Sequence, residues 1–194
     1  MLIIKPYIRE RAYAYARRWA FARNPLFADY TGRGGNCTNF ASQCALAASC
    51  VMNYTPNVGW YYLNDGDRSP SWTGVDFFFT FMTAGAGVGP FGRETDGTSL
   101  AVGDFIQLGR NDGGYYHTLV VVGREGEDYL VAAQSDDAFG RPLSTYNYDF
   151  ARYIHMLGVA EEMEDENGCF QSLVEGLSLP LAPADEIAPF PKET

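Results

Sequence analysis

One cysteine occupies a position at which a thiol becomes reactive. Cys37 follows Gly34, Gly35 and Asn36 and begins a predicted helix, with no charged residue from position 37 to position 51. Free backbone N–H groups and the helix dipole at such a start stabilise a thiolate. The same N–H groups can bind the oxyanion that forms when the thiolate attacks a carbonyl carbon. Cys37 is therefore the candidate nucleophile.

The other three cysteines lack this setting. Cys44 would lie two helical turns after Cys37, with the two Cα atoms about 10 Å apart, which is too far for a disulfide. The spacing of the four cysteines also matches no zinc-binding pattern. We expect Cys44, Cys50 and Cys169 to be structural thiols, and we expect neither a metal nor an organic cofactor.

A nucleophilic thiol needs a base, and the chain has two histidines. His117 follows a glycine-rich turn at 113–114 and opens the apolar, β-branched run 118–122, so it should lie at the mouth of a buried strand. His155 sits inside a predicted strand at 153–159, which is typical of a structural histidine. We predict that His117 is the general base and acid.

The imidazole of such a base is usually held by a third group on its second nitrogen. If strands 117–122 and 129–134 pair across a turn near residues 125–126, His117 lies opposite Gln134. Gln134 can accept a hydrogen bond through its amide oxygen, whereas Asp136 would hold an imidazolium more strongly through its charge. The third position is therefore open between Gln134 and Asp136.

Further polar and aromatic residues could complete the site. Asn36 and Thr38 flank the nucleophile and are expected either to cap the helix or to donate to an oxyanion. Trp60, Tyr61 and Trp72 lie in a loop-like tract and could form the wall of a substrate groove. The alternative is a large aromatic core, since the chain holds 13 Tyr and 13 Phe.

Hydrophobic periodicity predicts the elements that must position these residues. A helix at 38–50 is apolar all round and should be buried in the centre of the protein. Helices before an antiparallel sheet make an α+β fold. The predicted helices are 7–22, 38–50 and 74–83, and the predicted strands are 105–108, 118–122, 129–133 and 153–159.

The charge of the chain is concentrated in its C-terminal part. The net charge is −10, and residues 161–194 hold nine of the 24 acidic side chains but one of the 14 basic ones. Residues 1–160 are therefore nearly neutral and show no basic patch, so no nucleic-acid partner is expected. We predict a catalytic domain at 1–160 and an extended acidic tail at 161–194.

The chain carries no targeting or membrane signal that we can identify. The first 20 residues contain an apolar run of only three residues before charges follow, unlike a secretory signal. No stretch approaches the roughly 20 apolar residues of a membrane span. We expect a cytoplasmic protein, or a secreted one whose leader has been removed. No pattern predicts an oligomeric state.

With these residues placed, the chain resembles the putative amidase domain family, which is related to CHAP and NlpC-type peptidases. The resemblance covers roughly residues 7–157, and several motifs carry it in order. They are Tyr13-Ala14-Tyr15-Ala16, Trp19-Ala20, Asn24-Pro25, GGNCTNFASQ at 34–43, Met52-Asn53, GWYY at 59–62, SPSWTGV at 69–75, GDFIQL at 103–108, HTLVVVG at 117–123 and RPLS at 141–144.

The resemblance implies a papain-like fold, in which the nucleophile begins a central helix packed on an antiparallel sheet that supplies the histidine. It also implies cleavage of amide bonds, often in peptidoglycan or small peptides, and its motifs include Cys37 and His117. Two positions depart from the family pattern. Similar proteins usually carry Asp where this chain has Asn36, and many carry His where it has Gln134.

These inferences predict a cysteine-dependent amide-bond hydrolase that acts on peptide or peptidoglycan-fragment substrates. Two alternatives differ in class. A papain-fold module that has lost turnover would bind a peptide or glycan without cleaving it. An acyltransferase or transpeptidase would use the same two residues but transfer the acyl group to an amine instead of water.

Overall fold

Helix α2 (Cys37–Ser49) carries no charge, and the rest of the protein surrounds it. The computed structural model describes residues 2–85, 87–162 and 168–179. Within α2, every residue from Cys37 to Ala48 is buried. A helix without charged side chains can be enclosed in this way, because its polar side chains, such as Asn39 and Ser42, form hydrogen bonds inside the protein.

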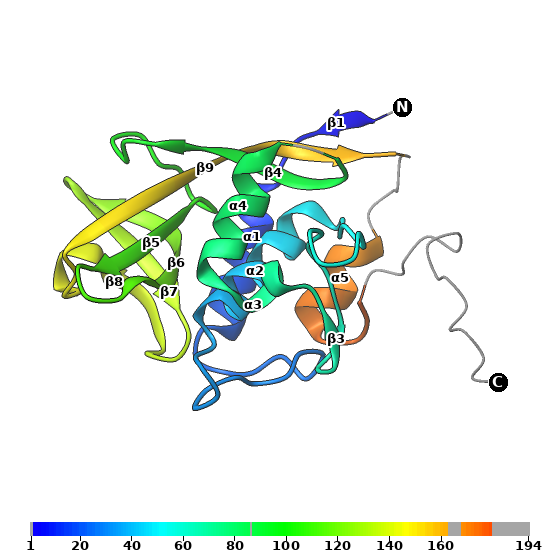
Figure 1. Ribbon diagram of the computed structural model, residues 1–194, viewed down its shortest axis with the longest axis horizontal. Helices are drawn as coiled ribbons and strands as arrows, with labels where there is room; N and C mark the ends of the chain where they lie inside the picture. The colour runs from blue at the N-terminus through cyan, green and yellow to red at the C-terminus, as the bar shows by residue number, and fades with distance from the viewer. Residues whose placement is uncertain (1, 86, 163–167, 180–194) are drawn as a thin grey trace.

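The elements alternate little between helix and strand, since most helices come first. The helices are α1 (Arg9–Trp19), α2, α3 (Pro70–Thr73), α4 (Val75–Ala84), the 3-10 helix η1 (Leu143–Thr145) and α5 (Gly168–Glu175). The strands are β1 (Ile3–Lys5), β2 (Tyr62–Asn64), β3 (Asp67–Arg68), β4 (Gly89–Thr95), β5 (Phe105–Arg110), β6 (Gly114–Glu125), β7 (Asp128–Ala133), β8 (Ala138–Pro142) and β9 (Phe150–Glu161). Figure 1 shows α2 at the centre, with α1, α3 and α4 around it, α5 on one side and strands β5 to β8 on the other.

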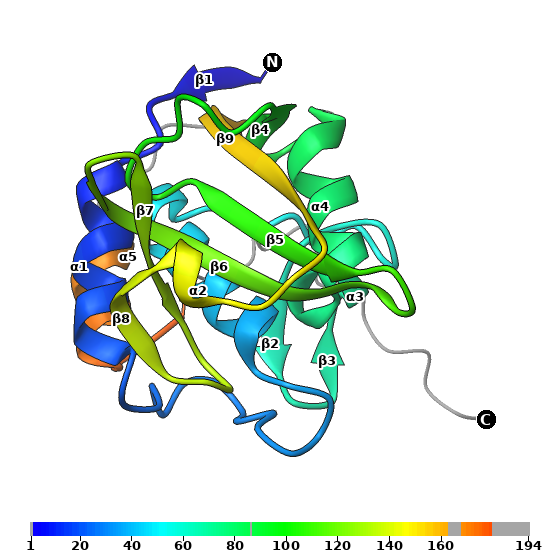
Figure 2. The same cartoon turned by 90° about the vertical axis from the view of Figure 1, so that its left-hand side faces the viewer.

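Strand β9 organises the main sheet, in which all neighbouring strands are antiparallel. The order is β1-β9-β5-β6-β7-β8, and β4 pairs with the other edge of β9. Strands β2 and β3 form a separate small hairpin. The two ends of β9 therefore serve different neighbours, with β5 along residues 150–154 and β1 along residues 159–161. Figure 2 shows the sheet lying across α2, with α1 and α4 on either side of it.

The two faces of the sheet bury different cores. Val120 and Val122 on β6 pack with the helices, whereas Leu119 and Val121 pack in a second cluster on the opposite face. This alternation is the two-residue period of a strand that is buried on both faces. Tyr146, which follows η1, packs against the second cluster. Strand β6 thus joins the helical core to the loop that carries Tyr146.

Most of the predicted elements are confirmed. The three predicted helices correspond to α1, α2 and α4, and the four predicted strands lie within β5, β6, β7 and β9. Strands β1, β4 and β8 were not predicted. They are short or contain glycine and proline, so their sequences lack a regular alternation, and their pairing with longer strands forms them. The fold has the predicted mixture of helices with an antiparallel sheet.

Trp60 and Trp72 do not form a groove wall, which corrects the prediction for these two residues, whereas Tyr61 is half-buried against the same core. Trp60 and Trp72 are fully buried, with ring centroids 4.9 Å apart. Trp72 Nε1 donates to the amide oxygen of Asn39 on α2 at 2.8 Å, and Tyr61 hydrogen-bonds Asp67. A buried Trp is stabilised when its ring packs against other side chains and its indole N–H finds a hydrogen-bond acceptor. The tract is therefore part of the core behind α2.

The segment after β9 is partly folded onto the domain. Helix α5 was predicted as part of an extended tail, but Leu173 is fully buried and the ring of Phe170 lies beneath the Arg11 guanidinium. Asn24 Nδ2 donates to the carbonyl of Leu173 at 3.0 Å, and Trp19 Nε1 donates to the carbonyl of Val174. The expectation of an extended conformation is therefore corrected for Gly168–Glu175, which is helical and anchored by apolar side chains. Residues 163–167 and 180–194 of the predicted tail lie outside the described structure.

No helix in the described ranges is both long and apolar enough to cross a membrane.

Replacing Leu173 by Ala should destabilise the protein because it removes a buried side chain that joins α5 to the domain. We expect the free energy of unfolding in urea to fall by about 3 kcal/mol. Leu177→Ala is the matched control, since Leu177 is 68% exposed, and it should change stability by less than about 0.5 kcal/mol. Equal, small effects of both substitutions would show that α5 does not contribute to the folded core.

Candidate active site

A glycine-rich loop brings the chain to Cys37. Gly34 and Gly35 have positive φ values of 103° and 104°, which side-chain-bearing residues rarely adopt. A Cβ atom on Gly35 would lie 3.6 Å from the hydroxyl of Ser135, so the loop passes close to the end of β7. These two glycines let the backbone turn directly into α2, with the thiol of Cys37 at the first helical residue.

Asn36 anchors this loop inside the protein. Its amide oxygen accepts hydrogen bonds from the backbone N–H of Tyr30 at 3.0 Å and from Asn39 Nδ2 at 2.8 Å. Its amide nitrogen donates to Gln134 Oε1, and its backbone N–H donates to the hydroxyl of Ser135. Every polar group of this 1%-exposed residue is therefore directed into the interior. Asn36 fixes the nucleophile loop and does not point into the pocket.

Gln134 does not contact His117, which corrects the predicted orienting role. Its Nε2 donates to the carbonyls of Trp19 and Ala22 at 2.7 and 2.8 Å, while its Oε1 accepts from Asn36. The reason is the register of β6 and β7. Val120 pairs with Ala132, so continuing the same register places Gln134 opposite Thr118 instead of His117. A shift of one residue reverses the face on which a side chain lies.

The side chains of Asn36 and Thr38 also do not supply oxyanion donors. Thr38 is buried, and its hydroxyl lies 2.9 Å from the hydroxyl of Thr118 on β6. Asn36 occupies the N-cap position of α2, but its side chain makes no capping hydrogen bond. Both residues connect the start of α2 to the sheet. Backbone N–H groups at the helix start are left as the donors available to an oxyanion.

A β-bulge positions His117. Leu108 on β5 pairs with His117, but the next residue, Gly109, pairs with Tyr115, so Tyr116 is an extra residue in β6. Bulges bend a strand and redirect side chains, and they are frequent next to active sites. Here the carbonyl of Tyr116 lies 4.0 Å from Cys37 Sγ, within range of a weak hydrogen bond from the thiol. The bulge thus brings this part of β6 against the start of α2.

Aromatic rings, and not a polar partner, surround the His117 imidazole. The ring centroid lies 6.0 Å from that of Tyr116 and 5.9 Å from that of Tyr146. Within the described part of the chain, no residue forms a hydrogen bond with the imidazole. Asp136, the other predicted partner, instead forms an ion pair with Arg141 at 2.6 Å. The structure therefore corrects the predicted role of Gln134, whereas Asp136 lines the same pocket as His117 and acts on the imidazole through its charge, without a hydrogen bond.

Burial makes the neutral forms of both site residues the stable ones. Desolvation lowers the pKa of His117 to about 4, with a smaller opposing effect from the negative charge of Asp136. Desolvation also raises the pKa of the Cys37 thiol, although the backbone N–H of Thr118 and the Thr38 hydroxyl act in the opposite direction. Both shifts favour the thiol and the neutral imidazole over an ion pair before substrate binds.

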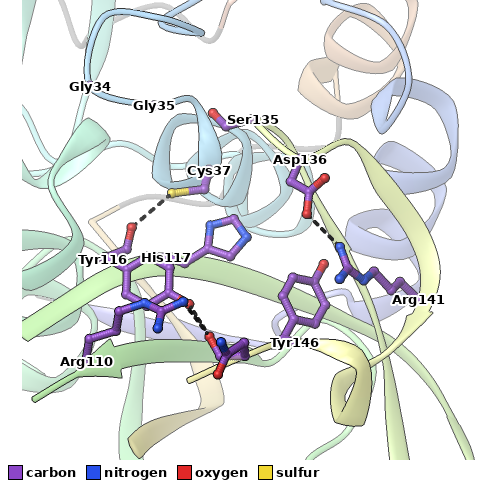
Figure 3. Close-up of a pocket in the computed structure, with 11 residues that line it drawn as sticks. Gly34, Gly35, Cys37, Arg110, Tyr116, His117, Ser135, Asp136, Arg141 and Tyr146 are labelled. Atoms are coloured by element: carbon purple, nitrogen blue, oxygen red, sulfur yellow. Dashed lines mark hydrogen bonds and ion pairs between the residues drawn. The ribbon is translucent and has the colours of Figure 1, made fainter. Parts of the chain in front are cut away.

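Cys37 and His117 line one open pocket of about 340 Å³ (Figure 3). Several of its residues were not predicted as site residues, namely Arg110, Tyr116, Ser135, Arg141, Tyr146 and Asn147. They come from the β5–β6 hairpin, the end of β7 and the segment around η1. Aromatic and basic residues in such turns have no local signature of a site. The sequence signal for the pocket was limited to the two glycine-rich turns that precede Cys37 and His117.

Gln134→Met should destabilise the protein strongly because it removes the buried amide while keeping the size of the side chain. The carbonyls of Trp19 and Ala22 and the amide nitrogen of Asn36 would each lose a partner. We expect a loss of about 3 kcal/mol in the free energy of urea unfolding. Gln171→Met on the exposed face of α5 is the control. A Gln134→Met protein as stable as this control would contradict the anchoring role.

Protonation of His117 should destabilise the folded protein. Because the pKa of this side chain falls from 6.5 to about 4 on folding, the unfolded chain binds an extra proton between these pH values. The stability that neutral His117 contributes is complete above pH 6.5 and is lost as the pH falls towards 4, by about 3 kcal/mol in total.

This pH effect can be isolated by comparing urea unfolding of the wild-type protein and His117→Gln at pH 7 and pH 4.5. Other titrating groups contribute equally to both proteins. The wild type should lose more stability than the variant over this interval. Identical losses would mean that the pKa of His117 is not lowered by folding.

Comparisons with known proteins agree with the resemblance of the sequence motifs. A family model described as a putative amidase domain matches residues 6–157, which include Cys37, His117 and Gln134. The uncharacterized protein YhbB of Bacillus subtilis (strain 168) is 32% identical over 136 residues. This alignment covers 68% of the chain but 42% of that relative, and no solved structure matches the chain significantly. The chain belongs to the putative amidase domain family.

Proposed function

We propose that this protein is a cysteine-dependent amide-bond hydrolase in which Cys37 is the nucleophile and His117 the general base and acid. Membership of the putative amidase domain family supports amide hydrolysis in general. The observation that carries the specific proposal is that a thiol at the start of a buried helix and a buried imidazole, far apart in the sequence, line the same pocket. Nucleophile and base within one pocket are the minimum that acyl transfer requires.

The resting pair reacts as neutral groups. Cys37 Sγ attacks the carbonyl carbon of the substrate amide while His117 takes the thiol proton. The carbonyl oxygen becomes an oxyanion that backbone N–H groups at the start of α2 can hold. His117 then gives the proton to the amide nitrogen, the C–N bond breaks and the amine leaves. A water molecule, deprotonated by His117, hydrolyses the thioester and regenerates the thiol.

The lowered pKa of His117 keeps the base unprotonated before attack, while it also makes the imidazole a weaker proton acceptor than a free histidine. A neutral imidazole with a pKa of about 4 is available as a proton acceptor throughout the neutral pH range. The thiol keeps its proton until a carbonyl is in place, because burial disfavours the thiolate. Charge therefore develops only during attack, where the helix N-terminus can stabilise it.

The arrangement of Cys37 and His117 and the size of the pocket also support a fold type and a substrate class. A nucleophile at the start of a central helix and a histidine from an antiparallel sheet are consistent with a papain-like arrangement related to CHAP and NlpC-type peptidases. An open pocket of about 340 Å³ can hold one or two residues of a peptide. We propose small peptides or peptidoglycan-type stem peptides as substrates.

Incubation with defined muropeptides and short peptides in H2-18O, followed by mass spectrometry, tests the function. We expect cleavage products whose new carboxyl group contains 18O. Cys37→Ala should lower kcat by at least about 1000-fold, since the covalent step is lost, and His117→Gln should have an effect of similar size. Cys44→Ala is the control for a buried thiol outside the pocket.

The same experiment distinguishes the alternatives. Products joined to an added amine, without 18O in the acyl fragment, would identify an acyltransferase. Binding without cleavage by the wild type would identify a binding module. Full activity of Cys37→Ala would overturn the proposed mechanism.

A further inference from the structure

The pocket contains more positive than negative charge. Arg110 and Arg141 line it, together with one acidic side chain, Asp136. Arg141 is already neutralised, since its Nη1 lies 2.6 Å from the Asp136 carboxylate. Its guanidinium also stacks on the Tyr146 ring at 3.9 Å and hydrogen-bonds Thr145. The contacts of Arg141 therefore stabilise the wall of the pocket, and its charge is already paired with Asp136.

Arg110, unlike Arg141, has no carboxylate partner among the described residues. It is the last residue of β5, and its Nη2 donates to the carbonyl of Asn147 at 3.1 Å. Across residues 2–85, 87–162 and 168–179, no acidic side chain forms an ion pair with this guanidinium. A guanidinium has five N–H donors, and the hydrogen bond to Asn147 uses only one of them. Arg110 thus presents an uncompensated, forked donor to the pocket.

Arg110 lines the same pocket as the nucleophile. Its Cζ atom lies 5.4 Å from the centre of the Tyr116 ring, and the carbonyl of Tyr116 lies 4.0 Å from Cys37 Sγ. Figure 3 shows Arg110 beside Tyr116, on the same side of the pocket as the thiol. A group bound by Arg110 would therefore lie in the same pocket as the amide under attack.

We propose that Arg110 binds a carboxylate of the substrate, on a residue adjacent to the scissile amide. The inference rests on the proposed function, because it assigns the substrate of that same site. The planar fork of a guanidinium matches a carboxylate with two parallel hydrogen bonds, and partial burial strengthens the pair. The preferred substrates are then peptides with a free terminal carboxylate or an acidic side chain next to the cleaved bond.

A purely structural role would explain Arg110 less well. The carbonyl of Asn147 also accepts a hydrogen bond from the Tyr116 hydroxyl at 3.0 Å. The loop is therefore held by a second donor when the Arg110 side chain is shortened or neutralised. For this reason Arg110→Gln should fold normally, and its effect should depend on the charge of the substrate.

Matched peptide pairs test the proposal. One pair has a leaving residue with either a free C-terminal carboxylate or a carboxamide, and the other has Glu or Gln on the acyl side of the scissile bond. For at least one pair, the wild type should cleave the anionic peptide with a kcat/KM about 10- to 100-fold higher. Arg110→Gln should abolish this preference, and Arg110→Lys should retain part of it. Arg17→Gln, on the exposed surface of α1, is the control and should behave as the wild type.

A binding measurement separates failure of this inference from failure of the proposed function. Calorimetric titration of Cys37→Ala with the same peptides needs no turnover. Tighter binding of the anionic member, lost when Arg110→Gln is added, would support the carboxylate site even if no peptide is cleaved. Equal preferences with and without the Arg110 guanidinium, in both cleavage and binding, would overturn it.

Discussion

The enclosure of helix α2 on all sides is the constraint on which the site depends. A charge-free helix is stabilised by apolar contact around its circumference, but the loop that enters it carries polar groups into the interior. Asn36 and Gln134 satisfy these groups, because their amides bond to each other and to the end of α1. Cys37 is therefore held by a buried hydrogen-bond network instead of by a flexible surface loop.

The same burial determines the proton chemistry of the site. A thiol and an imidazole that share a poorly solvated position both favour their neutral forms, so the pKa of Cys37 is raised and that of His117 is lowered. An ion pair present at rest is not needed for the proposed reaction. The rings of Tyr116 and Tyr146 flank the imidazole. In the proposed mechanism, this packing takes the place that a carboxylate or an amide occupies in a conventional triad.

Irregularities in the sheet supply the remaining parts of the pocket. The extra residue at Tyr116 turns β6 towards α2, and the hairpin before it carries Arg110 to the rim. The segment after β8 returns across the sheet and adds Tyr146 beside His117. A site assembled from hairpin ends in this way can vary its charge and its aromatic walls while the core around α2 stays unchanged.

The sequence by itself determined the central helix and pointed to Cys37 and His117, which the structure brings to one pocket, because each of these depends on local patterns. A charge-free run after two glycines predicts a buried helix that begins at Cys37. A histidine before a β-branched run predicts His117 at a strand end, whereas in the structure it lies inside β6, directly after the bulge at Tyr116. Only the tertiary structure decided the role of Gln134. The pairing of β6 with β7 shifts between Val121 and Gly123, which places Gln134 on the opposite face of the sheet from the imidazole. Bulges of this kind depend on contacts between strands, and no local pattern contains such contacts. Arg110 likewise joins the site only because folding brings its hairpin next to Cys37.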